Sequence, residues 1–407
     1  MKKLWLLLLC CPLFASQTLM VDPHLSPYSG SASLLFAQNV IIQAEDYVFD
    51  GEGHNGTAKV WGRTLEQLFF WYPINMLSSV AQHEFFGHGY RLRELGTHPT
   101  KYNITPWGGA TYFHMKESSS IGKFLAVDVA GLEGESILAR DTKMEWIRRG
   151  EIDGRLSIVY TQAAQSLFWY TLITKLGSIH DKGALNGNDV SGYVFLHNIT
   201  YPDKKLSIGK LTRWSLLNWI DPMTFYAYYS YFYYMAEGKP WSFPMLPLSE
   251  NIRYLPNIRI AYAPYAPEAY CENFFSIYGK PLYFYFKGGE RSWGMGFAYD
   301  HFLSGNRGSL GLRFDGWNHN LFETPSTLED LIEDKVVFHS IVKKRKWGCA
   351  LSLTSSIKLF SQLSLFLEVG GKTSGYLPGY SLGKEIVGRI GLSIDMFKGR
   401  EKQVEAK

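Results

Sequence analysis

Apolar residues recur at helical spacing through the first half of the chain, from about residue 30 to 240. Four segments are expected to be helices: 65–95, 121–141, 154–177 and 220–238. Pro73 predicts a kink in the first of them, because proline removes one hydrogen bond of the helical ladder. The last one has Asp221 as its N-cap and Gly238 just past its end, and both residue types favour these positions.

After the proline-rich stretch 239–248, apolar residues alternate with polar or small ones, which is the spacing of strands. Seven segments are expected to be strands: 281–289, 292–302, 308–317, 335–344, 347–354, 363–370 and 385–397. The predicted fold class is α+β, with a helical domain over 17–245 and an antiparallel β-meander over 246–400. Two forms of this meander stay open: the strands close into a membrane β-barrel, or they pack one face on the helices.

The composition favours the cell envelope. Aromatic residues make up 16% of the chain, and Tyr and Trp prefer places such as membrane interfaces, which are apolar at one end and wet at the other. The net charge is only +4 and no basic stripe is interleaved with aromatic residues, so we expect no nucleic-acid partner. The expected partner is a membrane, the bacterial outer membrane in particular. Cys271 and Cys349 allow one disulfide in an oxidising compartment.

The first residues have the pattern of a secretory signal peptide. Two lysines precede the apolar run 4–14, and Ala15 and Ser16 offer small residues for cleavage. The run is too short to span a bilayer. We therefore expect residues 1–16 to be removed and the protein to reside in the cell envelope, in the outer membrane or the periplasm.

The stretch QHEFFGHGYRLREL, residues 82–95, contains His83, Glu84 and His88. Two histidines four residues apart on a helix lie about 40° apart and can bind one ion. His83 and His88 are five residues apart, and an ideal helix separates them by about 140°. A π-bulge absorbs one extra residue within a turn, and the glycines on both sides of His88 tolerate the altered backbone. We therefore expect a bulge that returns both histidines to one face.

With one residue added, this stretch resembles the zincin metallopeptidases, whose signature is His-Glu-x-x-His. The resemblance rests on His83, Glu84, Gly87 and His88 and covers a small share of the chain. It implies that the two histidines bind zinc and that Glu84 is the general base that takes a proton from the metal-bound water. It also implies a peptide or protein substrate.

Zincins of the glutamate type take their third ligand from a second helix. The segment DVAGLEGES, residues 128–136, has the small residues that let two helices approach closely, and Asp128 shares a face with Glu135. The resemblance implies Glu135 as the third ligand, and Glu133, on another side, is the second choice. Asp128 is expected to orient a ligand histidine through its free ring N–H.

A structural interpretation of the same residues stays open. On a regular helix Glu84, His88 and Arg91 form one buried polar stripe, and Arg91 beside the site, or Arg93, neutralises Glu84. Two hypotheses of function follow. The first is a zinc-dependent, peptidase-like hydrolase of the bacterial cell envelope. The second is a non-catalytic outer-membrane or surface β-barrel protein whose histidine helix is structural.

Overall fold

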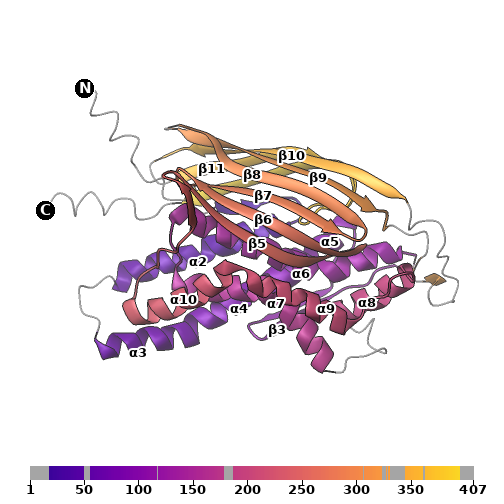
Figure 1. Cartoon of the computed structure of the whole chain (residues 1–407), viewed down its shortest axis with the longest axis horizontal. Coiled ribbons are helices and arrows are strands. Elements are labelled where there is room, and N and C mark those ends of the chain that lie inside the picture. Colours follow the sequence, from indigo (N-terminus) through magenta and orange to yellow (C-terminus); the bar gives the residue numbers. More distant parts are fainter. Residues whose placement is uncertain are drawn as a thin grey trace.

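The computed structural model describes residues 18–394 except 50–55, 117, 178–186, 306, 323–326, 328, 331–343 and 361–362. The expected signal segment 1–16 lies outside the described residues, as does nearly all of the expected strand 335–344. The described chain forms a layer of helices covered by one large sheet (Figure 1). The predicted α+β class is confirmed.

The helical layer is formed by the chain before residue 238. Its α-helices are α2 (Pro27–Phe49), α3 (Thr57–Glu66), α4 (Tyr72–Ala81), α5 (Gly89–Glu94), α6 (Ile121–Arg149), α7 (Ser157–Leu176), α8 (Asp189–Thr200), α9 (Ile208–Ser215) and α10 (Pro222–Glu237). Shorter helical segments are the π-helices η1 (Gln67–Trp71) and η2 (Gln82–His88) and the 3₁₀ segments η3 (Gly154–Leu156) and η4 (Leu216–Ile220). The elements from α3 to α5 follow one another without a gap, so the segment expected as one helix contains two π-helical turns.

Local capping explains where α6 and α10 end. The Asp221 carboxylate accepts a hydrogen bond from the Met223 N–H at the start of α10, and Pro222 occupies the first helical position. Gly238 ends α10 with φ 70°, and Gly150 ends α6 with φ 74°. Glycine adopts this left-handed conformation at little cost. These helix ends follow from the local sequence, as predicted for α10.

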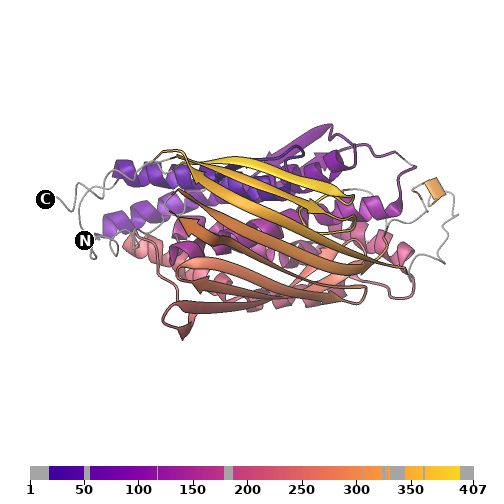
Figure 2. The ribbon, with the colours of Figure 1, turned by 90° about the horizontal axis from the view of Figure 1, so that it is seen from above.

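The sheet has ten antiparallel strands in the order β1-β12-β11-β10-β9-β8-β7-β6-β5-β4. They are β1 (Thr18–Val21), β4 (Leu246–Ser249), β5 (Ile252–Ala263), β6 (Ala266–Ile277), β7 (Lys280–Gly289), β8 (Ser292–Gly305), β9 (Gly308–Asn320), β10 (Arg345–Lys358), β11 (Leu363–Lys372) and β12 (Glu385–Ile394). β1 and β4 are its edges, and no pairing joins them among the described residues. The sheet is thus open and lies across the helices (Figure 2), whereas a closed barrel was one of the two expected forms.

The face of the sheet that packs on the helices carries paired charges. Lys287 Nζ lies 3.0 Å from Glu268 Oε2, and Arg259 Nε lies 2.8 Å from Glu272 Oε1. These charges occupy inward positions of β5, β6 and β7; β7 was among the expected strands, whereas β5 and β6 were not. A hydrophobic core lies between the helices and the sheet. Its large residues include Trp146, Tyr160, Phe274, Tyr283 and Tyr285.

The change from helices to strands falls where it was expected, since α10 ends at Glu237 and β4 begins at Leu246. One strand from the N-terminal part, β1, joins the sheet beside β12. Among the described residues no helix has both the length and the apolar content needed to cross a membrane. Cys271 and Cys349 are exposed free thiols, so the disulfide that the sequence allowed is not formed.

Candidate metal centre

The segment with the two histidines is a π-helix, η2, set between α4 and α5. The Gly89 N–H donates to the Glu84 carbonyl, five residues earlier, which is the hydrogen bond of a π-turn. One wide turn therefore takes up the five-residue spacing, and His83 and His88 project to the same side. The predicted bulge is confirmed.

Glycines let η2 and α6 approach backbone to backbone. A Cβ atom on Gly87 would lie 2.6 Å from the Ala130 carbonyl oxygen, and one on Gly131 would lie 2.3 Å from His83 Nε2. Real Cβ atoms do not come this close to other groups, so only glycine fits at either position without a shift. The expected close contact between the histidine helix and the glycine-rich helix is present, and Gly131 makes room for the His83 ring.

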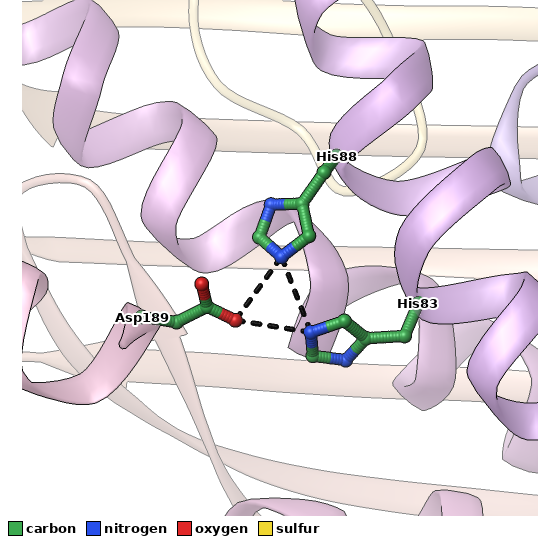
Figure 3. A group of neighbouring side chains, drawn as sticks. All are labelled: His83, His88 and Asp189. Atoms are coloured by element: carbon green, nitrogen blue, oxygen red, sulfur yellow. Dashed lines mark hydrogen bonds and ion pairs between the residues drawn. The ribbon is translucent and has the colours of Figure 1, made fainter. Parts of the chain in front are cut away.

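Three side-chain atoms converge at this contact (Figure 3). His83 Nε2 and His88 Nε2 each lie 3.0 Å from Asp189 Oδ2, and the two nitrogens are 3.1 Å apart. His88 is buried, and His83 and Asp189 are partly buried. Among the described residues these three side chains form the one group of His, Cys, Asp and Glu with the spacing to hold a metal ion.

The outer nitrogens of both rings are held by acceptors. His88 Nδ1 lies 2.8 Å from the Val127 carbonyl oxygen, which can only accept, so Nδ1 carries the proton. His83 Nδ1 lies 3.0 Å from Glu135 Oε2, and the other oxygen of this carboxylate accepts from Ser79 Oγ at 3.0 Å. In the neutral form of each ring, Nε2 then bears a lone pair directed at Asp189.

Two predicted positions are corrected by these contacts. Glu135 lies on the Nδ1 side of His83, because the ring turns Nε2 toward Asp189 on α8 and Nδ1 toward α6. The orienting contact of His88 comes from the Val127 carbonyl instead of the Asp128 carboxylate. Asp128 Oδ2 is buried without a hydrogen-bond partner among the described residues, and burial, with the charge of Asp189, raises the Asp128 pKa well above its usual value.

The pKa values show that the group favours positive charge at its centre. Burial alone would lower the pKa of His83, but the charge of Glu135 and the hydrogen bonds to Asp189 and Glu135 raise it well above the ordinary value. Burial also opposes protonation of His88, whose pKa the charge of Asp189 raises. Burial would raise the Asp189 pKa, and the two histidines lower it instead. A cation, either protons or a metal ion, satisfies this arrangement.

Glu84 lies beside the histidines and faces the hairpin formed by β2 (Lys101–Thr105) and β3 (Gly108–Tyr112). Its Oε2 accepts a hydrogen bond from Thr111 Oγ1 at 2.7 Å. A Cβ atom on Gly109 would lie 2.5 Å from Glu84 Cγ, so this glycine makes room for the side chain. The charge of Glu84 also contributes to raising the pKa of His88.

Arg91 lies in a separate cluster, and the expectation that it borders the site is corrected. Its guanidinium donates two hydrogen bonds to Glu133, at 2.9 and 3.1 Å, and one to Glu94 at 2.7 Å. Glu133, the second choice for the third ligand, is therefore occupied by this pair. The Arg91 guanidinium also donates a hydrogen bond, at 3.0 Å, to the carbonyl of Tyr380 in the segment between β11 and β12.

Sequence reasoning missed Asp189. It is the first residue of α8, behind the N-cap Asn188, whose side chain accepts from the Ser191 N–H. An acidic residue in the first turn of a helix is favoured by the helix dipole alone, so nothing in its local pattern indicates a ligand. It is separated from His83 by 106 residues, and only the packing of α8 against α6 brings it to the site.

Comparisons of the chain with protein families, with curated proteins and with solved structures found no match in any of the three.

Proposed function

We propose that His83, His88 and Asp189 bind one zinc ion and that the protein is a zinc-dependent, peptidase-like hydrolase. The observation that carries the proposal is that His83 Nε2, His88 Nε2 and Asp189 Oδ2 lie 3.0–3.1 Å from one another. When both rings are neutral, all three atoms are acceptors and none of them donates a hydrogen bond to another. Three lone pairs at such distances repel one another unless a cation lies between them. Glu135 and the Val127 carbonyl hold the outer nitrogens, as acceptors commonly do for the free ring N–H of metal-binding histidines.

The donor set and its spacing suit zinc. Zinc takes imidazole nitrogen and carboxylate oxygen at about 2.0–2.2 Å, and ligand atoms around a tetrahedral ion are then roughly 3.3 Å apart. The separations in the structure are a few tenths of an ångström shorter, a difference that small side-chain rotations remove. With three protein ligands, zinc keeps one position for water and lowers the pKa of that water to about 7.

Glu84 is the general base in this proposal. It is adjacent to a ligand, and Thr111 Oγ1 directs one carboxylate oxygen. A carboxylate placed next to the bound water can take its proton and pass it to the leaving group. Thr111 lies on β3, which pairs with β2 in the described part of the chain. Among the described strands β3 pairs only with β2, so an extended peptide can add along β3 next to Glu84, and this is the support for a peptide substrate.

The location in the bacterial cell envelope belongs to the proposal as well. Its support is the signal-like pattern of residues 1–16, a basic start followed by a short apolar run and small residues. N-terminal sequencing of the protein recovered from an envelope fraction tests it. A chain that still begins at Met1 and stays in the cytosol contradicts it.

Metal analysis of the purified protein tests the site. We expect about one zinc ion per chain in the wild type and less than a tenth of that in His88→Ala and Asp189→Ala, because each removes a direct ligand. His98→Ala is the matched control, since His98 is exposed and outside the site, and it should keep the metal. Stably folded wild-type protein that takes up no zinc after incubation with the ion would overturn the proposal.

Glu84→Gln separates metal binding from catalysis. The variant should keep the zinc and lose about 10²–10⁴-fold in kcat on a peptide library, since it removes the proton acceptor. Zinc content is measured on the same sample. If the variant with full zinc keeps wild-type turnover, Glu84 is not the base. If the zinc-loaded wild type cleaves no peptide, the site is not that of a peptidase.

A further inference from the structure

The outer face of the sheet, turned away from the helices, is apolar over its whole breadth. The side chains at outward positions in the middle of the strands are hydrophobic, small or uncharged. Large exposed ones are Ile258, Phe286, Trp293, Met295, Leu310, Trp347, Leu351, Leu353, Val369, Ile386, Ile390 and Leu392. Their exposed fractions run from 39% for Met295 to 89% for Ile386. The register continues this surface from β5 to β12 and on to β1, where Leu19 lies opposite Leu392.

The inner face of the same strands carries the charges. Buried inward-facing residues include Glu268, Glu272, Lys287, Asp315, Glu368 and Arg389. They are satisfied in pairs, for example Arg389 Nη1 with Glu368 Oε2 at 2.7 Å. A sheet that packs on helices in water shows the reverse, with the apolar face inward and the polar face outward. Strands with an apolar outer face and polar inner face are typical of proteins whose outer surface meets lipid.

Aromatic and charged residues gather at the ends of the strands. Trp293 and Trp347 lie together near one end, with ring centroids 5.1 Å apart. Near the other end Tyr254 packs on Phe275, and Tyr278 in the β6–β7 turn is exposed. Among outward positions of the described strands, charges stand only at the ends, as at Lys280 and Arg345. Aromatic side chains at both borders of an apolar band match the two interfaces of a bilayer.

The size and spread of the apolar surface distinguish lipid from a second copy of the chain. Strands spaced about 4.8 Å apart, with roughly ten residues at 3.3 Å each, give the eight strands β5–β12 an outer face of roughly 1,200 Å². Monomers rarely expose patches above 300–600 Å², and a standard interface takes about 800 Å² per partner. The helical layer also exposes large apolar side chains, among them Phe69, Ile173, Leu176, Phe225 and Phe232. One partner copy on the sheet would leave that layer uncovered.

We propose that the outer face of the sheet lies against the acyl chains of a lipid bilayer, with the strands crossing the apolar layer at a tilt. The strands β5–β12 have 10–14 residues each. A tilted strand of about 9–11 residues spans the hydrocarbon core of a bilayer. The inner, charged face then stays away from lipid, covered by the helices that carry the metal centre.

The two native thiols of the described chain provide the probes, because Cys271 and Cys349 are exposed on this face. Full-length variants keep one of them, and the remaining cysteines are changed to serine (C10S and C11S with C349S or C271S). The thiol is labelled with an environment-sensitive fluorophore. The protein is reconstituted into vesicles of phosphatidylcholine and phosphatidylglycerol, 3:1, with or without bromine on the acyl chains.

Labels at 271 and 349 should be quenched at least twofold by the brominated chains and shift to shorter emission wavelength. The control is Lys205→Cys in the cysteine-free background, since Lys205 is exposed in the charged loop between α8 and α9. Its label should be unaffected. Labels at 271 and 349 that remain water-accessible and unquenched would overturn the proposal. So would a lipid-free dimer, seen by sedimentation, that shields both labels from iodide.

This inference does not rest on the metal centre. Zinc content measured on the same reconstituted samples keeps the two outcomes separate. Quenched labels in a protein without zinc would support the lipid contact and contradict the zinc hydrolase. Unquenched labels in a protein with bound zinc would contradict the lipid contact and support the metal site.

Discussion

Two clusters of ionisable side chains, which both contact α6, are built in opposite ways. In the first, the Arg91 guanidinium meets both oxygens of Glu133, and this carboxylate also accepts from Tyr376 Oη at 2.8 Å and from the Gly379 N–H at 2.5 Å. Donors there face acceptors, and the cluster ties η2–α5 and α6 to the loop between β11 and β12. The second consists of His83, His88 and Asp189, where three atoms face one another that are all acceptors when both rings are neutral.

Only the cluster of Arg91 and Glu133 is complete without a further ligand. A buried ion pair with its own hydrogen bonds needs no further ligand, and changing one member leaves an uncompensated charge. Three converging acceptors need a cation that the described side chains supply only if the imidazoles are protonated. Both clusters perturb pKa values, so perturbation alone would not separate them. The direction of the donors and acceptors does.

The largest effect is expected from breaking the complete cluster. Arg91→Leu leaves Glu133 buried without its cation and should lower the free energy of unfolding by about 3–5 kcal/mol. Chemical denaturation of the variant and the wild type measures it. The double variant Arg91→Leu/Glu133→Leu should recover part of the loss, because an apolar pair of similar volume carries no desolvation cost. A loss below about 1 kcal/mol in the single variant would show that the cluster is not structural.

A smaller effect is expected at the outer contact of the metal centre. Glu135→Gln keeps an acceptor for His83 Nδ1 but removes the charge, and should weaken zinc binding by about 10–100-fold. Competition with a zinc chelator measures the affinity. Glu145→Gln is the matched control, because Glu145 lies on the same helix in ion pairs with Arg148 and Arg149. If both variants bind zinc equally, Glu135 plays no part in the site.

The smallest effect is expected from pH in the metal-free protein. Folding raises the pKa of His83 and His88 above the ordinary 6.5. The stabilisation from their protonation is therefore fully present below about pH 6.5 and is lost as pH rises through the raised values. Arg91 stays charged throughout and contributes no slope. Melting temperatures of chelator-treated protein should fall as pH rises through this window, and His83→Asn should flatten the curve.

Zinc should reverse this trend, because protons compete with the metal for the same nitrogens. Zinc-loaded protein is then expected to lose its metal as pH falls. Melting temperatures that do not depend on pH in either form would contradict the charge assignment of the cluster.

The sequence predicted the two histidines and the wide turn between them. It did not predict which ring nitrogen Glu135 contacts or that Asp189 joins the site. The spacing of His83 and His88, with glycines on both sides of His88, predicted the wide turn that η2 forms. The choice of third partner was wrong because a histidine ring has two nitrogens on different sides. The sequence indicates that Glu135 approaches His83, but the rotation of the ring decides which nitrogen it meets. Asp189 was out of reach because a helix-start carboxylate has an ordinary local explanation.

Local sequence accounts for many of the elements and for the alternation along the strands. Helix ends follow from caps such as Asp221 and Gly238, and strands follow from the period of two, since both depend on neighbours a few residues away. Which face of the sheet turns inward depends on tertiary packing. Alternation along a strand separates two faces but does not indicate which of them packs on the helices. Here the helices lie on the face that carries Glu268 and Lys287. Likewise, the Asp189 carboxylate reaches the two imidazoles only because α8 packs against α6. His83 and Asp189 are 106 residues apart in the chain, so their contact depends on tertiary packing.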